Sequence, residues 1–134
     1  WSSDVCSSDL RDNIYLPLVL AGEDYREMEQ KIRPIAQALC ITELLDKYPY
    51  EVSGGQKQRA AVARALITDP RLILADEPTG NLDEQTADEV MTLLLDLVQQ
   101  AGASLLMVTH SARLAARLDR QLVLKAGRLH GSAA

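Results

Sequence analysis

Residues 53–83, which read SGGQKQRAAVARALITDPRLILADEPTGNLD, decide how this chain is organised. They predict a helix that begins after Ser53, a short apolar strand at residues 71–75, two adjacent acids and a turn. Asp69-Pro70 precedes the strand, and a short aliphatic run of this kind is typical of a strand that is buried on both faces. The stretch therefore indicates an α/β fold.

The start of the predicted helix has two interpretations. Ser53 followed three residues later by Gln56 is a capping-box pattern. Gly54 and Gly55 are each worse than alanine in a helical turn by about 1 kcal/mol, so they need a reason. Close approach of a ligand to bare backbone is one, because a helix N-terminus favours an anion such as phosphate. Taken alone, the four residues leave a plain cap and an anion site as alternatives.

Two carboxylates, Asp76 and Glu77, follow the strand, and Pro78 ends it. Ligand sites in open α/β sheets lie at the carboxyl ends of strands. One acid can hold Mg²⁺ while the other polarises an attacking water. A pair of solvated acids at a strand end is the alternative.

A second strand is predicted at residues 104–108, after an amphipathic helix at 84–100 that Gly102 ends. A strand–helix–strand unit gives two parallel strands, so His110 is expected at the same sheet edge as Asp76 and Glu77. A lone histidine after a strand is more often structural, but the neighbouring acids favour a functional role here. Residues 120–124 and 128–130 predict a terminal hairpin that turns at Ala126-Gly127.

These segments resemble the motifs of ABC ATPases, in the family's order and spacing. Residues 53–59 resemble the signature, residues 72–77 the Walker B strand with its catalytic glutamate, residues 80–83 the D-loop, and residues 108–110 the switch histidine. The resemblance covers roughly residues 13–129. It implies a P-loop NTPase-like parallel sheet core with an α-helical subdomain, and it implies ATP and Mg²⁺ as cofactors.

The resemblance also implies a role for each site residue. Asp76 would hold Mg²⁺ through water, Glu77 would be the general base, and His110 would contact the γ-phosphate. The residues expected to bind the nucleotide of a second subunit in a head-to-tail dimer are Ser53, Gly54, Gly55 and Gln56, with Asp83 coupling the two sites.

Composition limits the alternatives. The 134 residues are 47% hydrophobic with 4% aromatic residues, which suits an aliphatic α/β core. A net charge of −5 argues against a nucleic-acid partner, because such proteins carry a basic face. No stretch is long enough to span a bilayer, and no export signal is recognisable.

The domain organisation follows from these motifs. Residues 1–11 contain Ser-Ser-Asp twice and show neither a helical nor a strand period of apolar residues. They are expected to be a non-native or disordered leader. Residues 12–52 correspond to the helical subdomain, and residues 53–134 to the signature helix and an ATPase core without its Walker A part.

Several local expectations concern residues 12–52. Asp12-Asn13 would cap a short segment at 14–20, Pro34 would kink or split a helix at 24–39, and Thr42 would cap a helix to about Lys47. Cys40 is expected to pack in a helical core.

The resemblance is strongest to the lipoprotein-release and macrolide-export group of bacterial transporter ATPases, carried by residues 14–18 and 80–83. It implies a transmembrane permease as partner and a cytoplasmic position on the inner face of the membrane. Among Ile14, Leu16 and Leu18, exposed side chains would contact the permease, with packing inside the subdomain as the alternative. A soluble ABC ATPase of DNA repair and a non-catalytic interaction module are the other hypotheses.

The 134 residues contain no Gly-x-x-x-x-Gly-Lys-Ser/Thr loop and no Q-loop glutamine before Gln30. We therefore predict that this polypeptide alone neither binds ATP tightly nor hydrolyses it, because the cradle for the β- and γ-phosphates is missing. Titration calorimetry with Mg-ATP checks this. Micromolar affinity would contradict it.

Overall fold

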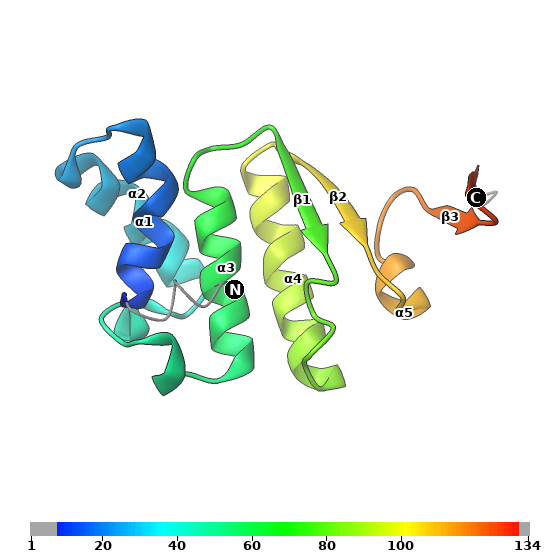
Figure 1. Cartoon of the computed structure of the whole chain (residues 1–134), viewed down its shortest axis with the longest axis horizontal. Coiled ribbons are helices and arrows are strands. Elements are labelled where there is room, and N and C mark those ends of the chain that lie inside the picture. The colour runs from blue at the N-terminus through cyan, green and yellow to red at the C-terminus, as the bar shows by residue number, and fades with distance from the viewer. Residues whose placement is uncertain (1–7, 132–134) are drawn as a thin grey trace.

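The computed structural model describes residues 8–131 and has a helical half and an α/β half (Figure 1). The first half contains α1 (Leu10–Ala21), α2 (Tyr25–Ala38) and two 3₁₀ turns, Thr42–Leu44 and Pro49–Glu51. Then follow α3 (Gly54–Leu66), β1 (Leu72–Asp76), α4 (Glu84–Gln100), β2 (Ser104–Val108), α5 (Ala112–Ala115), β3 (Leu122–Lys125) and β4 (Arg128–Gly131). The predicted α/β class is confirmed.

The two central strands pair as the sequence predicted. β1 and β2 are parallel, with Leu72 opposite Ser104 and Asp76 opposite Val108. The helix α4 connects them and lies beside α3 (Figure 1). One face of this sheet packs on the helices through Ile73, which is buried.

The expectation that the first strand is buried on both faces is wrong for the described residues. Leu74 is 71% exposed, and Leu106 and Val108 on β2 are also exposed. Within residues 8–131 the sheet has two strands, and the side chains on its second face, Leu72, Leu74, Leu106 and Val108, are all exposed. A continuous apolar run has the same sequence pattern whether helices cover one face of the strand or both. The pattern therefore could not show that one face is exposed.

The helix α1 begins earlier than predicted. Asp9 caps it by accepting the N–H of Asp12 at 2.8 Å, and Leu10 is fully buried. Asp12 and Asn13 are therefore helical residues rather than the cap. Leu10 and Arg11 are helical, so the alternative of disorder does not hold for these two residues of the expected leader at 1–11, and residues 1–7 lie outside the described part of the chain.

Pro34 does not split α2, which is continuous from Tyr25 to Ala38. A proline inside a helix costs about 3 kcal/mol. Ile32 and Ala36, on either side of it, are fully buried, and burial of a large aliphatic side chain gains about 1.5–3 kcal/mol. Core packing on both sides of Pro34 thus keeps the helix together.

The end of α2 corrects two further expectations. Cys40 is exposed, with a left-handed φ of 55°, because it turns the chain so that the N–H of Ile41 can bond to the carbonyl of Ala36 at 2.9 Å. Ile41 takes the buried place instead. Thr42 caps no helix. It is the first residue of a 3₁₀ turn whose N-cap is Ile41 and which has no side-chain cap bond.

The C-terminal part agrees with the sequence in outline. Ser111 caps α5, which ends at Ala115 rather than near Leu118. β3 and β4 form the predicted antiparallel hairpin, and Ala126 and Gly127 both have positive φ at its turn. The hairpin does not pair with β2 in the described structure.

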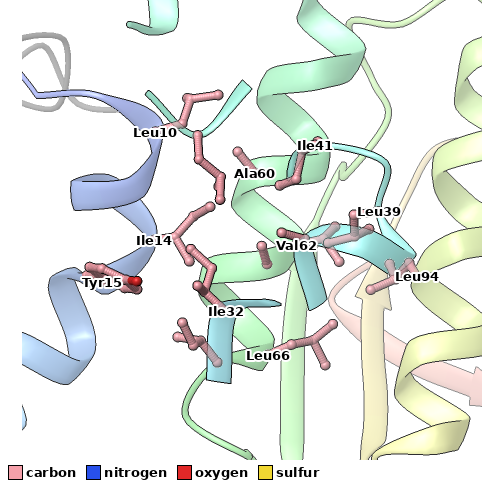
Figure 2. Packing of buried hydrophobic residues seen from close by; sticks show 14 of the residues in the cluster. Leu10, Ile14, Tyr15, Ile32, Leu39, Ile41, Ala60, Val62, Leu66 and Leu94 are labelled. Carbon is pink, nitrogen blue, oxygen red and sulfur yellow. The ribbon is translucent and has the colours of Figure 1, made fainter. Parts of the chain in front are cut away.

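The main core lies where α1 and α2 pack on α3. Figure 2 shows side chains from these helices and from the segment after α2 converging on α3, among them Leu10, Ile14, Ile32, Leu39, Ile41, Ala60 and Leu66. Met91 of α4 is fully buried, as expected of a core residue. Ile14 and Leu18 are buried as well, so the packing alternative holds for both, while Leu16 is exposed.

The side chain of Arg59 on α3 is mostly buried and bonds to two other segments. Its Nη2 lies 3.1 Å from Glu89 Oε2 on α4, and its Nη1 donates to the carbonyl of Leu39 at 3.4 Å. Arg59 therefore joins α3 to the end of α2 and to α4.

Of the helices in residues 8–131, none is both long and apolar enough to cross a membrane.

The burial of α1 gives a matched stability test. Leu18→Ala should lower the free energy of unfolding by about 2–5 kcal/mol, because Leu18 is 1% exposed and its removal leaves a cavity. Leu20→Ala should change it by less than about 0.5 kcal/mol, since Leu20 is 80% exposed on the same helix. Urea unfolding of both variants checks this, and equal losses would contradict the described packing.

Candidate functional site

Asp76, Glu77 and His110 meet at the carboxyl ends of β1 and β2. The N–H of Glu77 donates to the carbonyl of Val108 at 2.9 Å, which extends the parallel ladder by one residue. The N–H of His110 then donates to Glu77 Oε1 at 2.6 Å, and His110 Nε2 lies 3.7 Å from the same oxygen. The predicted convergence at one sheet edge is confirmed.

Thr109 is a site residue that the sequence reasoning did not single out. Its Oγ1 donates to Glu77 Oε2 at 3.3 Å and accepts the N–H of Ser111 at 3.1 Å. Both carboxylate oxygens of Glu77 are thus held by the segment after β2. The strand register could have predicted this contact, because Asp76 pairs with Val108 and the next residues along the chain are Glu77 and Thr109.

The three predicted residues differ in exposure. The side chain of His110 is 98% exposed and that of Glu77 is 34% exposed. Asp76 is exposed, and none of the hydrogen bonds described within residues 8–131 involves its carboxylate. The imidazole of His110 and the carboxylate of Asp76 are therefore accessible to a ligand, while the carboxylate of Glu77 is held in place.

A cation at Asp76 would need ligands from outside the protein. Across the part of the chain that the structure describes, no three or more His, Cys, Asp or Glu residues are arranged to hold a metal. Mg²⁺ commonly binds through one or two carboxylates together with phosphate oxygens and water. The exposed Asp76 carboxylate fits a site of that kind and does not form a complete protein site.

The N-terminus of α3 has the predicted capping box. Ser53 Oγ accepts the N–H of Gln56 at 3.2 Å, and Gln56 Oε1 accepts the N–H of Ser53 at 2.9 Å. No acceptor within residues 8–131 takes the N–H of Gly54 or Gly55. The helix therefore is capped and still has backbone donors for an anion at its positive end. The two alternatives raised by the sequence are compatible.

Asp83 caps α4 rather than standing free. Its Oδ1 accepts the N–H of Thr86 at 3.0 Å, and its Oδ2 accepts the Thr86 hydroxyl at 2.6 Å. The hydroxyl, and after it the backbone N–H, of Thr86 lower the pKa of the Asp83 carboxyl below its ordinary value. The charged form of Asp83 is the one that the fold favours.

The predicted site residues form two groups. Asp76, Glu77 and His110 lie at the sheet edge, and residues 53–56 with Asp83 lie at the adjacent N-termini of α3 and α4 (Figure 1). Within the described residues no hydrogen bond joins the groups. Each group has polar atoms that face solvent: the carboxylate of Asp76 and the imidazole of His110 in the first, and the N–H of Gly54 in the second.

A parallel sheet with acids and a histidine at its carboxyl edge, next to a glycine-led helix N-terminus, defines an α/β nucleotide-binding domain. The model of the family described as "ABC transporter" matches residues 4–80, which is more than half of the chain. The chain belongs to the ABC transporter family, as part of an ATP-binding domain. The resemblance inferred from the motifs is confirmed.

Its relatives include the uncharacterized ABC transporter ATP-binding protein YvcR of Bacillus subtilis, with 50% identity over 119 residues. The lipoprotein-releasing system ATP-binding proteins LolD of Legionella pneumophila and Novosphingobium aromaticivorans are 44% and 47% identical. The matches cover 89%, 89% and 87% of this chain and 46%, 52% and 52% of these relatives. The chain thus spans about half of their length.

A solved structure has the same fold. It is that of cbiO1 from Clostridium perfringens, described as part of the ABC transporter complex cbiONQ, with a TM-score of 0.83 and 27% identity. The match covers 92% of this chain and 49% of that one.

The lowered pKa of Asp83 predicts a pH-dependent stability difference. Its charge stabilises the fold above the ordinary pKa of about 3.9, and this contribution is lost as the pH falls through the lower folded value. Asp83→Asn should therefore be less stable than the parent at pH 7, and the difference should shrink below about pH 4. Urea unfolding between pH 3 and pH 7 checks this, with Asp119→Asn as the exposed-aspartate control. A difference that stayed constant with pH would contradict it.

Proposed function

We propose that this chain supplies the signature and the water-activating residues of an ATP-hydrolysing subunit in a bacterial ABC transporter of the export or lipoprotein-release type. The observation that carries this is the Glu77 carboxylate, held by Thr109 and the backbone of His110 at the carboxyl ends of two neighbouring parallel strands. The 44% identity to the LolD protein of Legionella pneumophila, whose name assigns it to a lipoprotein-releasing system, supports the transporter group.

ATP and Mg²⁺ are the cofactors of this proposal. Asp76 would hold Mg²⁺, directly or through water, with the remaining ligands coming from phosphates and water. When bound, the ion neutralises phosphate charge during phosphoryl transfer. The exposed Asp76 carboxylate at the strand end suits this role.

Glu77 acts as the general base in the proposed reaction. A base must be held within hydrogen-bond reach of the water whose proton it takes, and Thr109 and His110 fix the Glu77 carboxylate from one side. The 34% exposure of the Glu77 side chain leaves the other side open to a water. The imidazole of His110, almost fully exposed beside it, contacts the γ-phosphate.

The second group of residues binds the nucleotide of another subunit. The N–H groups of Gly54 and Gly55 and the positive end of α3 favour phosphate, with Ser53 and Gln56 forming the cap that keeps the helix start ordered. Asp83 lies at the neighbouring helix start and couples the two sites. Since the two groups share no hydrogen bond within residues 8–131, a head-to-tail dimer, in which each nucleotide meets both, fits the arrangement.

A transmembrane permease is the proposed second partner, which would place the subunit at the inner face of the cytoplasmic membrane. The helical subdomain, residues 12–52, has exposed apolar side chains for such a contact. They lie in the second half of α1 and at the start of α2: Leu16, Val19, Leu20 and Tyr25. The acidic net charge of −5 agrees with a protein partner rather than a nucleic acid.

A chimera tests the catalytic assignment. Residues 8–131 replace the matching segment of the Legionella pneumophila LolD protein, and phosphate release from Mg-ATP is measured. Glu77→Gln should lower kcat by about 10²–10⁴, the usual contribution of a general base. Co-purification of the chimera with the LolD permease partners tests the transporter assignment.

The matched control is Glu43→Gln. Glu43 is exposed on the 3₁₀ turn after α2, so the same chemical change there should leave kcat within about twofold. Equal turnover in the parent and in Glu77→Gln would refute the role of Glu77. A folded chimera without turnover would refute the proposed activity.

A further inference from the structure

The N-terminus of α3 packs directly on the first turn of α4. A Cβ atom added to Gly55 would lie 2.6 Å from Cγ2 of Thr86, a separation that real side chains do not adopt. At Gly54 the nearest atom, Leu82 Cδ2, would be 3.5 Å away, which is ordinary contact. Gly55 is buried and Gly54 is exposed. The two adjacent glycines therefore have different reasons to be glycine.

The reason for Gly55 lies inside the chain. One of the two interpretations of the sequence was that both glycines allow a ligand to approach, but the space next to Gly55 is filled by the methyl group of Thr86. Interiors are packed so closely that an added methyl group forces its neighbours to move. Thr86 thus requires a glycine at this position whether or not a nucleotide is present.

The other branch of Thr86 faces Asp83. Its hydroxyl donates to Asp83 Oδ2 at 2.6 Å, and its N–H donates to Oδ1 at 3.0 Å. Because threonine is branched at Cβ, one χ1 rotamer fixes the hydroxyl and the methyl group together. The rotamer that holds Asp83 is the one that places Cγ2 against Gly55.

We propose that Thr86 is a positioning residue which joins the start of α3 to the Asp83 loop, its methyl group seated on Gly55 and its hydroxyl holding the Asp83 carboxylate. This role rests on the proposed function, in which both groups face the nucleotide of the second subunit. A displacement of one group would then carry the other with it. The start of α3 and the Asp83 loop thus meet the nucleotide as one rigid unit.

A double-variant cycle tests the packing. Gly55→Ala should lower the Tm by about 3–10 °C through overpacking, although alanine is otherwise the better helix former. Thr86→Ser removes Cγ2, and adding it to Gly55→Ala should restore at least half of the lost Tm. Gly54→Ala is the matched control, and it should be no less stable than the parent chain and gain nothing from Thr86→Ser.

Thermal unfolding is followed by circular dichroism in the 134-residue chain and in the LolD chimera. The proposal is overturned if Gly55→Ala is as stable as Gly54→Ala, or if Thr86→Ser does not restore the Tm of Gly55→Ala.

The titration of Asp83 tests the hydroxyl. Thr86→Val keeps a methyl group against Gly55 but loses the donor, so the Asp83 carboxyl should titrate at a higher pH, as seen by ¹³C NMR. Thr86→Ser keeps the donor and should leave the titration of Asp83 in place. The charged side chains near Asp83 on its own element are Glu84 and Asp88 of α4, and the packed element α3 carries Lys57 and Arg59 in its first turns. An Asp83 titration that is unchanged in Thr86→Val overturns the proposal.

Turnover in the chimera separates positioning from direct contact. Gly55→Ala should lower phosphate release, and Thr86→Ser should recover at least half of the loss. Turnover that stays low while the Tm recovers would assign Gly55 to nucleotide contact alone and would overturn the proposal. A parent chimera without turnover would refute the proposed function, while unfolding and the Asp83 titration would still decide the role of Thr86.

Discussion

The backbone N–H of Glu77 donates to the carbonyl of Val108, one step beyond the last residue pair of the parallel ladder between β1 and β2. This bond fixes where the chain leaves the sheet at the end of each strand. Since Glu77 departs with a left-handed φ of 43°, its carboxylate turns back toward Thr109 and His110. The rest of the site depends on this pairing, because without it the acid and the imidazole have no common position.

The helices hold this sheet edge in place. α3 is the shared element, with α1 and α2 on one side and α4 on the other (Figure 1). Arg59 connects α3 to Glu89 of α4. On the far side, Arg113 of α5 pairs with Asp88 and lies 3.2 Å from Glu84, both on α4. The segment after His110 is thereby fixed to the same helix that Asp83 caps.

The glycines of the signature show how one residue type can serve two purposes. Gly54 is exposed, and a Cβ atom added to it would make only an ordinary contact with Leu82, so packing inside the chain does not require a glycine there. Gly55 is buried against Thr86 and is required by packing between two helices. A motif recognised for its chemistry thus also contains a structural contact, and only the coordinates separate the two.

Much of the fold could be predicted because it depends on local signals. The capping box at Ser53 and Gln56, the strand at 104–108, the helix at 84–100 and the hairpin turn at 126–127 all follow from short-range propensity and periodicity. The convergence of Glu77 and His110 was predictable too, because a strand–helix–strand unit of this length gives parallel neighbours.

Other features were decided by packing between distant segments. Pro34 remains helical because Ile32 and Ala36 are buried on either side of it, and Cys40 is exposed because Ile41 takes the core position. The sequence by itself determined the family and the order of the elements, and it supplied the residues proposed for the two groups, since these depend on residue type and spacing. The tertiary structure alone decided that Thr109 holds Glu77 and that Thr86 excludes a side chain at Gly55, because both depend on atoms brought together from different elements.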